Sequence, residues 1–198
     1  MKVNIEKVFP LEAPVSQAWA FLQNIPGVAS CMPGAEITEQ VDANNYKGSV
    51  KVKIGPATAA FKGDIEIKGI DASKRELKML GKGADVKGTS SASMDLTASV
   101  RETADGRSEL VGNAEVNVSG KMASLGGRMM TQVSDQILKQ FGDNFANQVL
   151  AMGEGAAAEA AASKAAEQPK ELNGLALMWG VFIGFLKSLF GGKQKPAA

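Results

Sequence analysis

Residues 90–118 read SSASMDLTASVRETADGRSELVGNAEVNV, and this stretch decides the fold. Apolar and polar side chains alternate from Ser90 to Val100 and again from Glu109 to Val118, which is the pattern of two half-buried strands. Between the two runs, Asp105-Gly106 is a typical turn signal. The stretch therefore predicts an antiparallel hairpin with one face toward solvent and the other under a covering layer.

The same alternation continues upstream of this hairpin. Three further runs with turn residues between them are Tyr46–Ile54, Ala59–Lys68 and Glu76–Gly83. Because the links are short and rich in turn residues, the runs predict a curved antiparallel meander. Near the amino terminus, Lys2 to Val8 predicts one more strand, and the apolar spacing from Pro14 to Asn24 predicts a helix.

Residues 124–150 supply the covering layer. Large apolar residues recur there at every fourth position, which predicts an amphipathic helix. A helix of about 25 residues is about 38 Å long, so it can cross a whole sheet. The residues of this stripe are Leu125, Met129, Val133, Ile137, Phe141, Phe145 and Val149.

The strand positions that face this helix are unusually small. Gly63, Gly81, Gly83, Ala92 and Gly112 are among them. Small residues leave volume for an apolar guest, and methionines provide adaptable walls. Alternatively, the helix packs closer at these positions, or the glycines mark bends of the sheet.

A binding cavity between sheet and helix would need both apolar walls and a few polar groups. The polar residues that could orient a head group are Ser90, Ser91, Thr97 and Tyr46. The residues that we expect in the cavity wall are Phe61, Met79, Met94, Met129, Val133, Ile137 and Phe141.

Composition excludes several kinds of site. The chain has no His and one Cys, so His-dependent catalysis and His- or Cys-cluster metal sites are excluded, and we expect no metal and no catalytic residues. Cys31 has no adjacent cation, which favours a buried, unreactive thiol.

Residues 1–150 carry 17 basic and 17 acidic side chains, so they provide no basic face for nucleic acid. The amino-terminal residues lack the apolar stretch of a secretory signal, which indicates a cytoplasmic protein.

The composition changes after residue 150, and three parts are expected. Residues 1–150 form the ligand-binding domain. Residues 151–171 are rich in Ala, Glu and Lys, lack large apolar residues after Met152, and predict a flexible linker that is partly helical. Residues 172–198 form an apolar tail that ends in lysines.

The tail predicts a membrane-associating helix. Its apolar run from Leu172 to Phe190 is marginal for spanning a bilayer, which needs about 20 apolar residues. A helix in the membrane interface accommodates both this length and the terminal lysines. An oligomerisation helix, or one that docks on a partner, is the alternative. The residues expected at the membrane are Trp179, Phe182, Ile183, Phe185, Leu186, Lys187 and Phe190.

Several spaced motifs, in order, resemble one known family. The motifs are Cys31-Met32-Pro33-Gly34-Ala35-Glu36, Gly48 to Pro56, Phe61-Lys62-Gly63, the glycines Gly81, Gly83 and Gly88, and Gly120 to Arg128. Together they are similar to the CoxG family of carbon monoxide dehydrogenase accessory proteins, over about residues 1–150. That family belongs to the START-like, helix-grip SRPBCC superfamily.

The resemblance implies a fold and a function. It implies an α+β helix-grip fold, in which a curved antiparallel sheet wraps around a long carboxy-terminal helix. It also implies a non-catalytic accessory protein that attaches a molybdenum–copper CO dehydrogenase, or a related molybdenum hydroxylase, to the inner face of the cell membrane. The superfamily fold encloses an apolar cavity, and for this family a respiratory quinone of the menaquinone type, or another lipid, is the expected guest.

Two other functions stay open at this point. The body could be an empty docking or assembly adaptor for a molybdenum hydroxylase. It could also be a cyclase-like or hydrolase-like enzyme, as some superfamily members are, but the helix-facing strand positions named above include no acid.

Overall fold

The computed structural model describes residues 1–54, 57–125 and 127–166, with the side chains of residues 52–57 and 125–130 excepted. In this part of the chain, seven strands form one antiparallel sheet in the order β1-β7-β6-β5-β4-β3-β2. The strands are β1 (Lys2–Leu11), β2 (Ala35–Gln40), β3 (Asn45–Ile54), β4 (Ala57–Asp71), β5 (Glu76–Asp85), β6 (Ser90–Glu102) and β7 (Ser108–Gly120).

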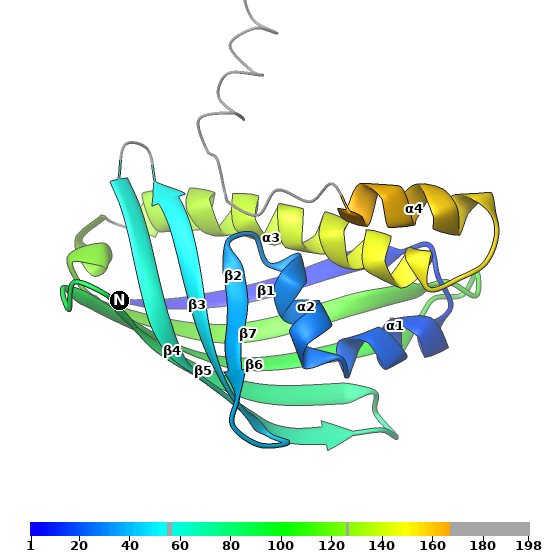
Figure 1. The fold of residues 1–198 in the computed structure, drawn as a ribbon, viewed down its shortest axis with the longest axis horizontal. Coiled ribbons are helices and arrows are strands. Elements are labelled where there is room, and N and C mark those ends of the chain that lie inside the picture. Colours follow the sequence, from blue (N-terminus) through cyan, green and yellow to red (C-terminus); the bar gives the residue numbers. More distant parts are fainter. Residues whose placement is uncertain (55–56, 126, 167–198) are drawn as a thin grey trace, which may run out of the picture.

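The helices lie on one side of this sheet, which curves toward them (Figure 1). They are α1 (Val15–Leu22), α2 (Ile25–Cys31), the 3-10 turn η1 (Lys121–Leu125), α3 (Gly127–Ala151) and α4 (Ala156–Ala166). The α1–α2 pair carries the chain from β1 at one edge of the sheet to β2 at the other edge. Helix α3 then crosses the concave face, which confirms the expected α+β helix-grip arrangement.

The period-two pattern predicted the strands well because one face of each strand is solvated. In β1, for example, burial alternates residue by residue from Lys2 to Pro10. Strand β2 corresponds to none of the predicted runs. It is a six-residue edge strand, AEITEQ, and its last four residues alternate little because three of them are exposed.

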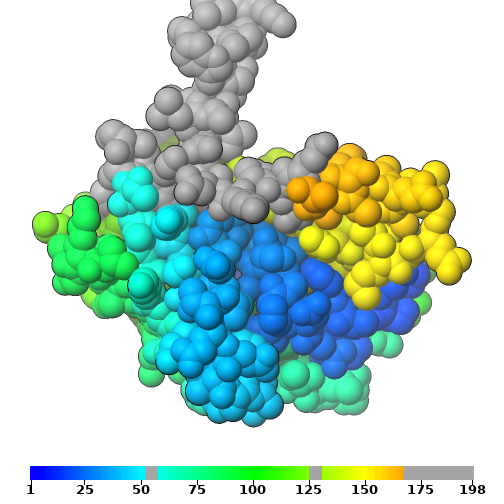
Figure 2. Space-filling view, in the orientation of Figure 1, coloured from blue at the N-terminus to red at the C-terminus, as the bar shows by residue number. Residues whose placement is uncertain are grey.

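The segment expected as a flexible linker contains a packed helix. Helix α4 runs back along α3 and buries Ala158 and Ala161 against the body. Figure 2 shows α4 (orange) lying against the end of α3 (yellow). The sequence argument counted only large apolar residues, whereas alanines allow two helices to pack closely. Residues 156–166 therefore form the helical part that the sequence allowed within the linker, and this helix packs on the body.

The core is concentrated at one end of the sheet. Helix α1 packs on β6 and β7, while α2 and α3 pack on each other and on the sheet edges. The rings of Phe21 and Phe145 meet edge to face, with centroids 5.0 Å apart. The Asn144 side-chain amide also donates a hydrogen bond to the Cys31 carbonyl (2.9 Å), which ties α3 to α2. This end of the interior is sealed.

Candidate apolar binding site

Burial of the helix-facing side chains falls from one end of β5 and β6 toward the middle of the sheet, and it rises again at Ser90 and Val118, which are 7% and 5% exposed. In β5, Leu77 is 2% exposed, whereas Met79 and Gly81 are only half-buried. In β6, Val100 is 1% exposed, whereas Met94 is half-buried. Helix α1 packs on β6 and β7 at the sealed end. Solvent therefore reaches the middle of the concave face.

The strand register brings the half-buried residues into continuous rows. Ile65 pairs with Gly81, Gly81 with Met94, and Met94 with Val116, so these four residues share one face. In α3, Val133 and Ile137 are also half-buried. We call this surface the open apolar face; it consists of Phe61, Ile65, Met79, Gly81, Met94, Leu96, Val116, Val133 and Ile137.

Two glycines explain the shape of this face. A Cβ atom at Gly63 would lie 1.9 Å from the Lys82 carbonyl oxygen, so β4 and β5 approach too closely there for any side chain. A Cβ atom at Gly81 would meet nothing closer than the Met94 Cε atom at 3.9 Å. The first glycine marks a bend, and the second leaves space. Both interpretations of the small residues therefore apply, at different positions.

Most of the expected wall residues belong to the open apolar face. Phe61, Met79 and Met94 lie on the sheet, and Val133 and Ile137 lie on α3. Phe141 instead packs between Phe9 and Phe145, with centroids 5.8 Å from each, at the border of the sealed core. The Met129 side chain lies outside the described residues. Whether these residues contact a ligand stays a prediction.

Of the polar residues expected near a head group, two face away from the open apolar face and two face inward but have hydrogen-bond partners within the protein. Ser91 and Thr97 lie on the outer side of β6, and Ser91 bonds to the Ser119 hydroxyl (2.6 Å). Ser90 faces inward, but its hydroxyl accepts a hydrogen bond from the Met122 amide (3.0 Å). Tyr46 is buried, and its hydroxyl donates to the Ala43 carbonyl (3.3 Å). The alternating pattern of β6 places Ser91 and Thr97 on its outer side, so the sequence could already have excluded them as residues that orient a head group.

Two hollows lie elsewhere on the described surface. One of about 300 Å³ lies between β1 and α3, where Lys7 forms an ion pair with Asp135 (2.9 Å). The other, of about 680 Å³, is lined by residues of β4, β5, β6 and β7 and by Met1. Neither hollow is lined by an expected wall residue.

Two described titratable groups, one in the sealed core and one beside the open apolar face, have shifted pKa values. Burial raises the pKa of the Cys31 thiol to about 12, so this thiol is unreactive, as the sequence predicted. Asp85, at the inward-facing end of β5, accepts a hydrogen bond from the Thr89 hydroxyl (2.8 Å), which lowers its pKa. A carboxylate that is held ionised is a poor general acid. The described residues also contain no cluster of metal-ligating side chains.

The membrane-associating residues expected in the tail, from Trp179 to Phe190, lie outside the described residues. None of the helices in the described ranges has the length and apolar character needed to cross a bilayer.

Comparison with solved structures shows the fold. A conserved protein from Geobacillus kaustophilus is 20% identical, with a TM-score of 0.66, over 74% of this chain and 95% of that chain. The Zhui aromatase/cyclase from Streptomyces sp. R1128 is 12% identical, with a TM-score of 0.54, over 75% and 94%. A START superfamily protein from Mycobacterium smegmatis is 10% identical, with a TM-score of 0.54, over 76% and 99%.

Comparison of sequences gives the family. No curated protein sequence matches the chain. The family model for CoxG, the G subunit of carbon monoxide dehydrogenase, matches residues 8–150, which include the whole meander and nearly all of α3. The chain therefore belongs to the carbon monoxide dehydrogenase CoxG family and has the START-like helix-grip fold.

Proposed function

We propose that this protein is a non-catalytic accessory protein that binds a lipid or a respiratory quinone of the menaquinone type on its open apolar face. The observation that carries the proposal is the fall in burial toward the middle of the sheet. Apolar side chains such as Met79 and Met94 face the helix and yet remain solvent-accessible. Covering such a surface with an apolar molecule is favourable by about 25 cal/mol for each Å² removed from water.

The chemistry of the face limits the class of ligand. Its described side chains are aliphatic, aromatic or thioether groups, and the polar candidates point outward or have partners within the protein. Such a surface offers few hydrogen-bonding groups to a polar substrate, and the inward-facing Asp85 carboxylate beside Phe61 is held by the Thr89 hydroxyl. An isoprenoid or acyl chain fits it best, and the thioethers of Met79 and Met94 can adapt to an irregular chain.

We further propose that the tail holds the protein at the inner face of the cell membrane, where it couples a CO dehydrogenase-type oxidoreductase to that membrane. The family to which the chain belongs supports the partner. The apolar run that begins at Leu172, and the lysines that follow it, support the membrane. A bound quinone would accept two electrons from the oxidoreductase and two protons from solvent, and would leave as a quinol. The protein would supply the binding surface and the attachment.

Organic extraction of the full chain, purified from its native membranes, tests the binding proposal. Mass spectrometry should detect a quinone or another isoprenoid or acyl lipid in the extract. Titration of the stripped protein with a menaquinone analogue should then restore a stoichiometric complex on gel filtration. If the extract holds no lipid and no analogue is taken up, the protein is an empty adaptor instead.

Deletion of residues 172–198 tests the membrane proposal separately. We expect the shortened protein to move from the membrane to the soluble fraction after a high-salt wash, because the deletion removes the apolar run. Immunoblotting of the two fractions measures this. If the shortened protein stays with the washed membranes, the tail is not the anchor.

A further inference from the structure

The open apolar face does not enclose a guest completely. Met79 and Met94 on the sheet, and Val133 and Ile137 on α3, are all half-buried in the described part of the chain. Binding pockets for small apolar molecules usually bury about 70–90% of the ligand surface. At a bilayer, the surrounding lipid can cover the rest of a guest on this face. In water, the rest of the guest needs another apolar surface.

The chain carries a second apolar surface that also needs cover in water. The run from Leu172 to Phe190 contains one charged residue, Lys187. Extended apolar surface of this kind usually marks a site of interaction. Because the run and the open apolar face belong to one molecule, each can cover the other.

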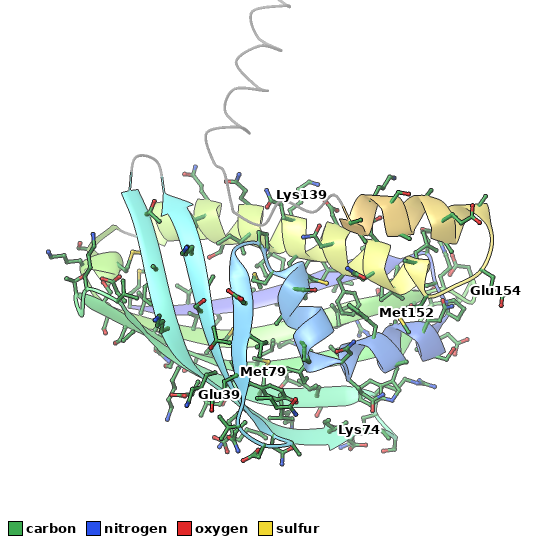
Figure 3. All side chains as sticks on the ribbon, viewed as in Figure 1. Glu39, Lys74, Met79, Lys139, Met152 and Glu154 are labelled. Carbon is green, nitrogen blue, oxygen red and sulfur yellow. The ribbon has the colours of Figure 1, made fainter. Side chains whose placement is uncertain are left out.

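Helix α4 brings the start of this run toward the open apolar face. It packs on α3 and runs back along it (Figure 1), so its eleven residues carry the chain about 16 Å from the carboxyl end of α3. Ile137 lies about 21 Å from Ala151 along α3. Figure 3 labels Lys139 on α3 near the point where α4 ends in that view. Helix α4 therefore ends close to the half of α3 that borders the open apolar face.

The remaining distance is short. Residues 167–171 can span at most about 17 Å, so Leu172 can reach the open apolar face while α4 stays packed on α3. A short tether gives the attached segment an effective concentration on the order of millimolar. Even a weak contact between the run and the face would therefore form within one chain.

We propose that residues 172–190 close over the open apolar face and its guest when the protein is away from a membrane, and that their insertion into a bilayer opens the face. This inference rests on the proposed function, because it gives the tail a second position that completes the same binding site. The run cannot occupy both positions, so attachment to the membrane and opening of the face are coupled. A lipid or quinone would then pass between bilayer and protein without crossing water.

Two single-cysteine variants of the full chain test the closed position. Met94→Cys places a benzophenone label on the open apolar face, and Asp95→Cys places the same label on the outer side of β6. Cys31 is buried with a raised pKa, so it does not react with the label. Without vesicles, illumination should join position 94, but not position 95, to a peptide from residues 172–190 of the same chain. Mass spectrometry of the digested protein identifies this peptide.

Vesicles of phosphatidylcholine and phosphatidylglycerol provide the open position. Once the chain has bound them, the yield of the crosslink at position 94 should fall at least about tenfold, because the run is then in the bilayer. A yield that vesicles leave unchanged, equal yields at the two positions, or no crosslink to the tail would overturn the proposal. A crosslinked product of twice the mass would also overturn it, because a second copy would then cover the face.

Affinity for a menaquinone analogue, measured on the stripped full chain without vesicles or detergent, tests whether the cover retains the guest. One variant interrupts the run with Phe182→Asn, Phe185→Asn and Leu186→Asn, and its matched control carries Gly192→Asn, Gln194→Asn and Ala197→Asn beyond the run. We expect the affinity to fall at least about tenfold in the first variant and to be unchanged in the control.

The other outcomes of this titration separate the inference from the proposed function. Equal affinities in the interrupted and unaltered chains would show that the tail does not cover the guest. A higher affinity in the interrupted chain would show that the tail competes with the guest, which also overturns the proposal. If no chain takes up the analogue, the proposed function itself is wrong.

Discussion

Gly63 and Gly81 lie on neighbouring strands and have opposite surroundings. At Gly63 the backbone of β5 occupies the place of a side chain, whereas at Gly81 the nearest atom belongs to the flexible end of Met94. The first glycine is required by the curvature of the sheet. The second is not required by the fold, and the space beside it is available for a ligand.

This contrast gives a prediction for stability. Gly63→Ala should lower the free energy of unfolding by about 1–3 kcal/mol, because a Cβ atom at 1.9 Å from the Lys82 oxygen forces the two strands apart. Gly81→Ala should change it by no more than about 0.5 kcal/mol. Urea unfolding of both variants measures the difference. Equal losses would mean that the two glycines have the same structural role.

Arg107 gives a prediction for pH dependence. Its guanidinium group bonds to Glu12 and to Asp105, and these contacts lower the pKa of both carboxyl groups. A carboxylate with a lowered pKa stabilises the fold above its ordinary pKa, near 4, and loses this effect as the pH falls through its folded value. Arg107→Gln should therefore destabilise the protein at neutral pH and have progressively less effect in acid.

Urea unfolding at several pH values tests this prediction. The stability difference between Arg107→Gln and the unaltered protein should be largest near neutrality and should diminish as the pH falls below about 4. A difference that is independent of pH would show that the arginine acts through packing rather than through its charge.

Among the elements, strands were easier to predict than the covering layer. Apolar and polar residues alternate in Ser90–Glu102 and Ser108–Gly120 because each strand has one buried and one solvent-exposed face. The central meander could therefore be predicted from the sequence. Strand β2 is short and polar, and helix α4 packs through alanines, so neither has a strong hydrophobic pattern. These two elements depend on neighbours that are distant in sequence.

The site was predictable only in part, for a similar reason. The small helix-facing residues indicated space, and Met79 and Met94 were correctly placed on the helix-facing side. The sequence could not show that α1 seals one half of the concave face and leaves the other half accessible. That distinction depends on where α1 crosses β6 and β7, which no local pattern records.

Helix α4 gives a prediction at the element scale. Ala158→Glu with Ala161→Glu should release α4 from α3, because each change buries a charge without a partner. Ala157→Glu with Ala160→Glu alters the charge equally at exposed positions and should leave α4 in place. Hydrogen exchange of residues 156–166 should be faster only in the first variant. Equal protection in both variants would contradict the observed packing.

On the scale of the whole molecule, the two ends of the sheet have different tasks. The end covered by α1, α2 and the second half of α3 holds the core, with Phe145 and Val149 fully buried. The other end carries the open apolar face. The sealed half stabilises the fold, and the other half leaves apolar side chains accessible for the ligand that we propose.

The most direct test of ligand binding compares one substitution at two glycines. Gly81→Leu fills the space on the open apolar face, and Gly69→Leu makes the same change at an exposed position of β4 with nothing within 4 Å of the added Cβ atom. For the stripped full chain, we expect the affinity for a menaquinone analogue to fall at least about tenfold, or about 1.4 kcal/mol, in Gly81→Leu and to be unchanged in Gly69→Leu. Equal affinities in a folded Gly81→Leu variant and in the unaltered protein would contradict binding on this face.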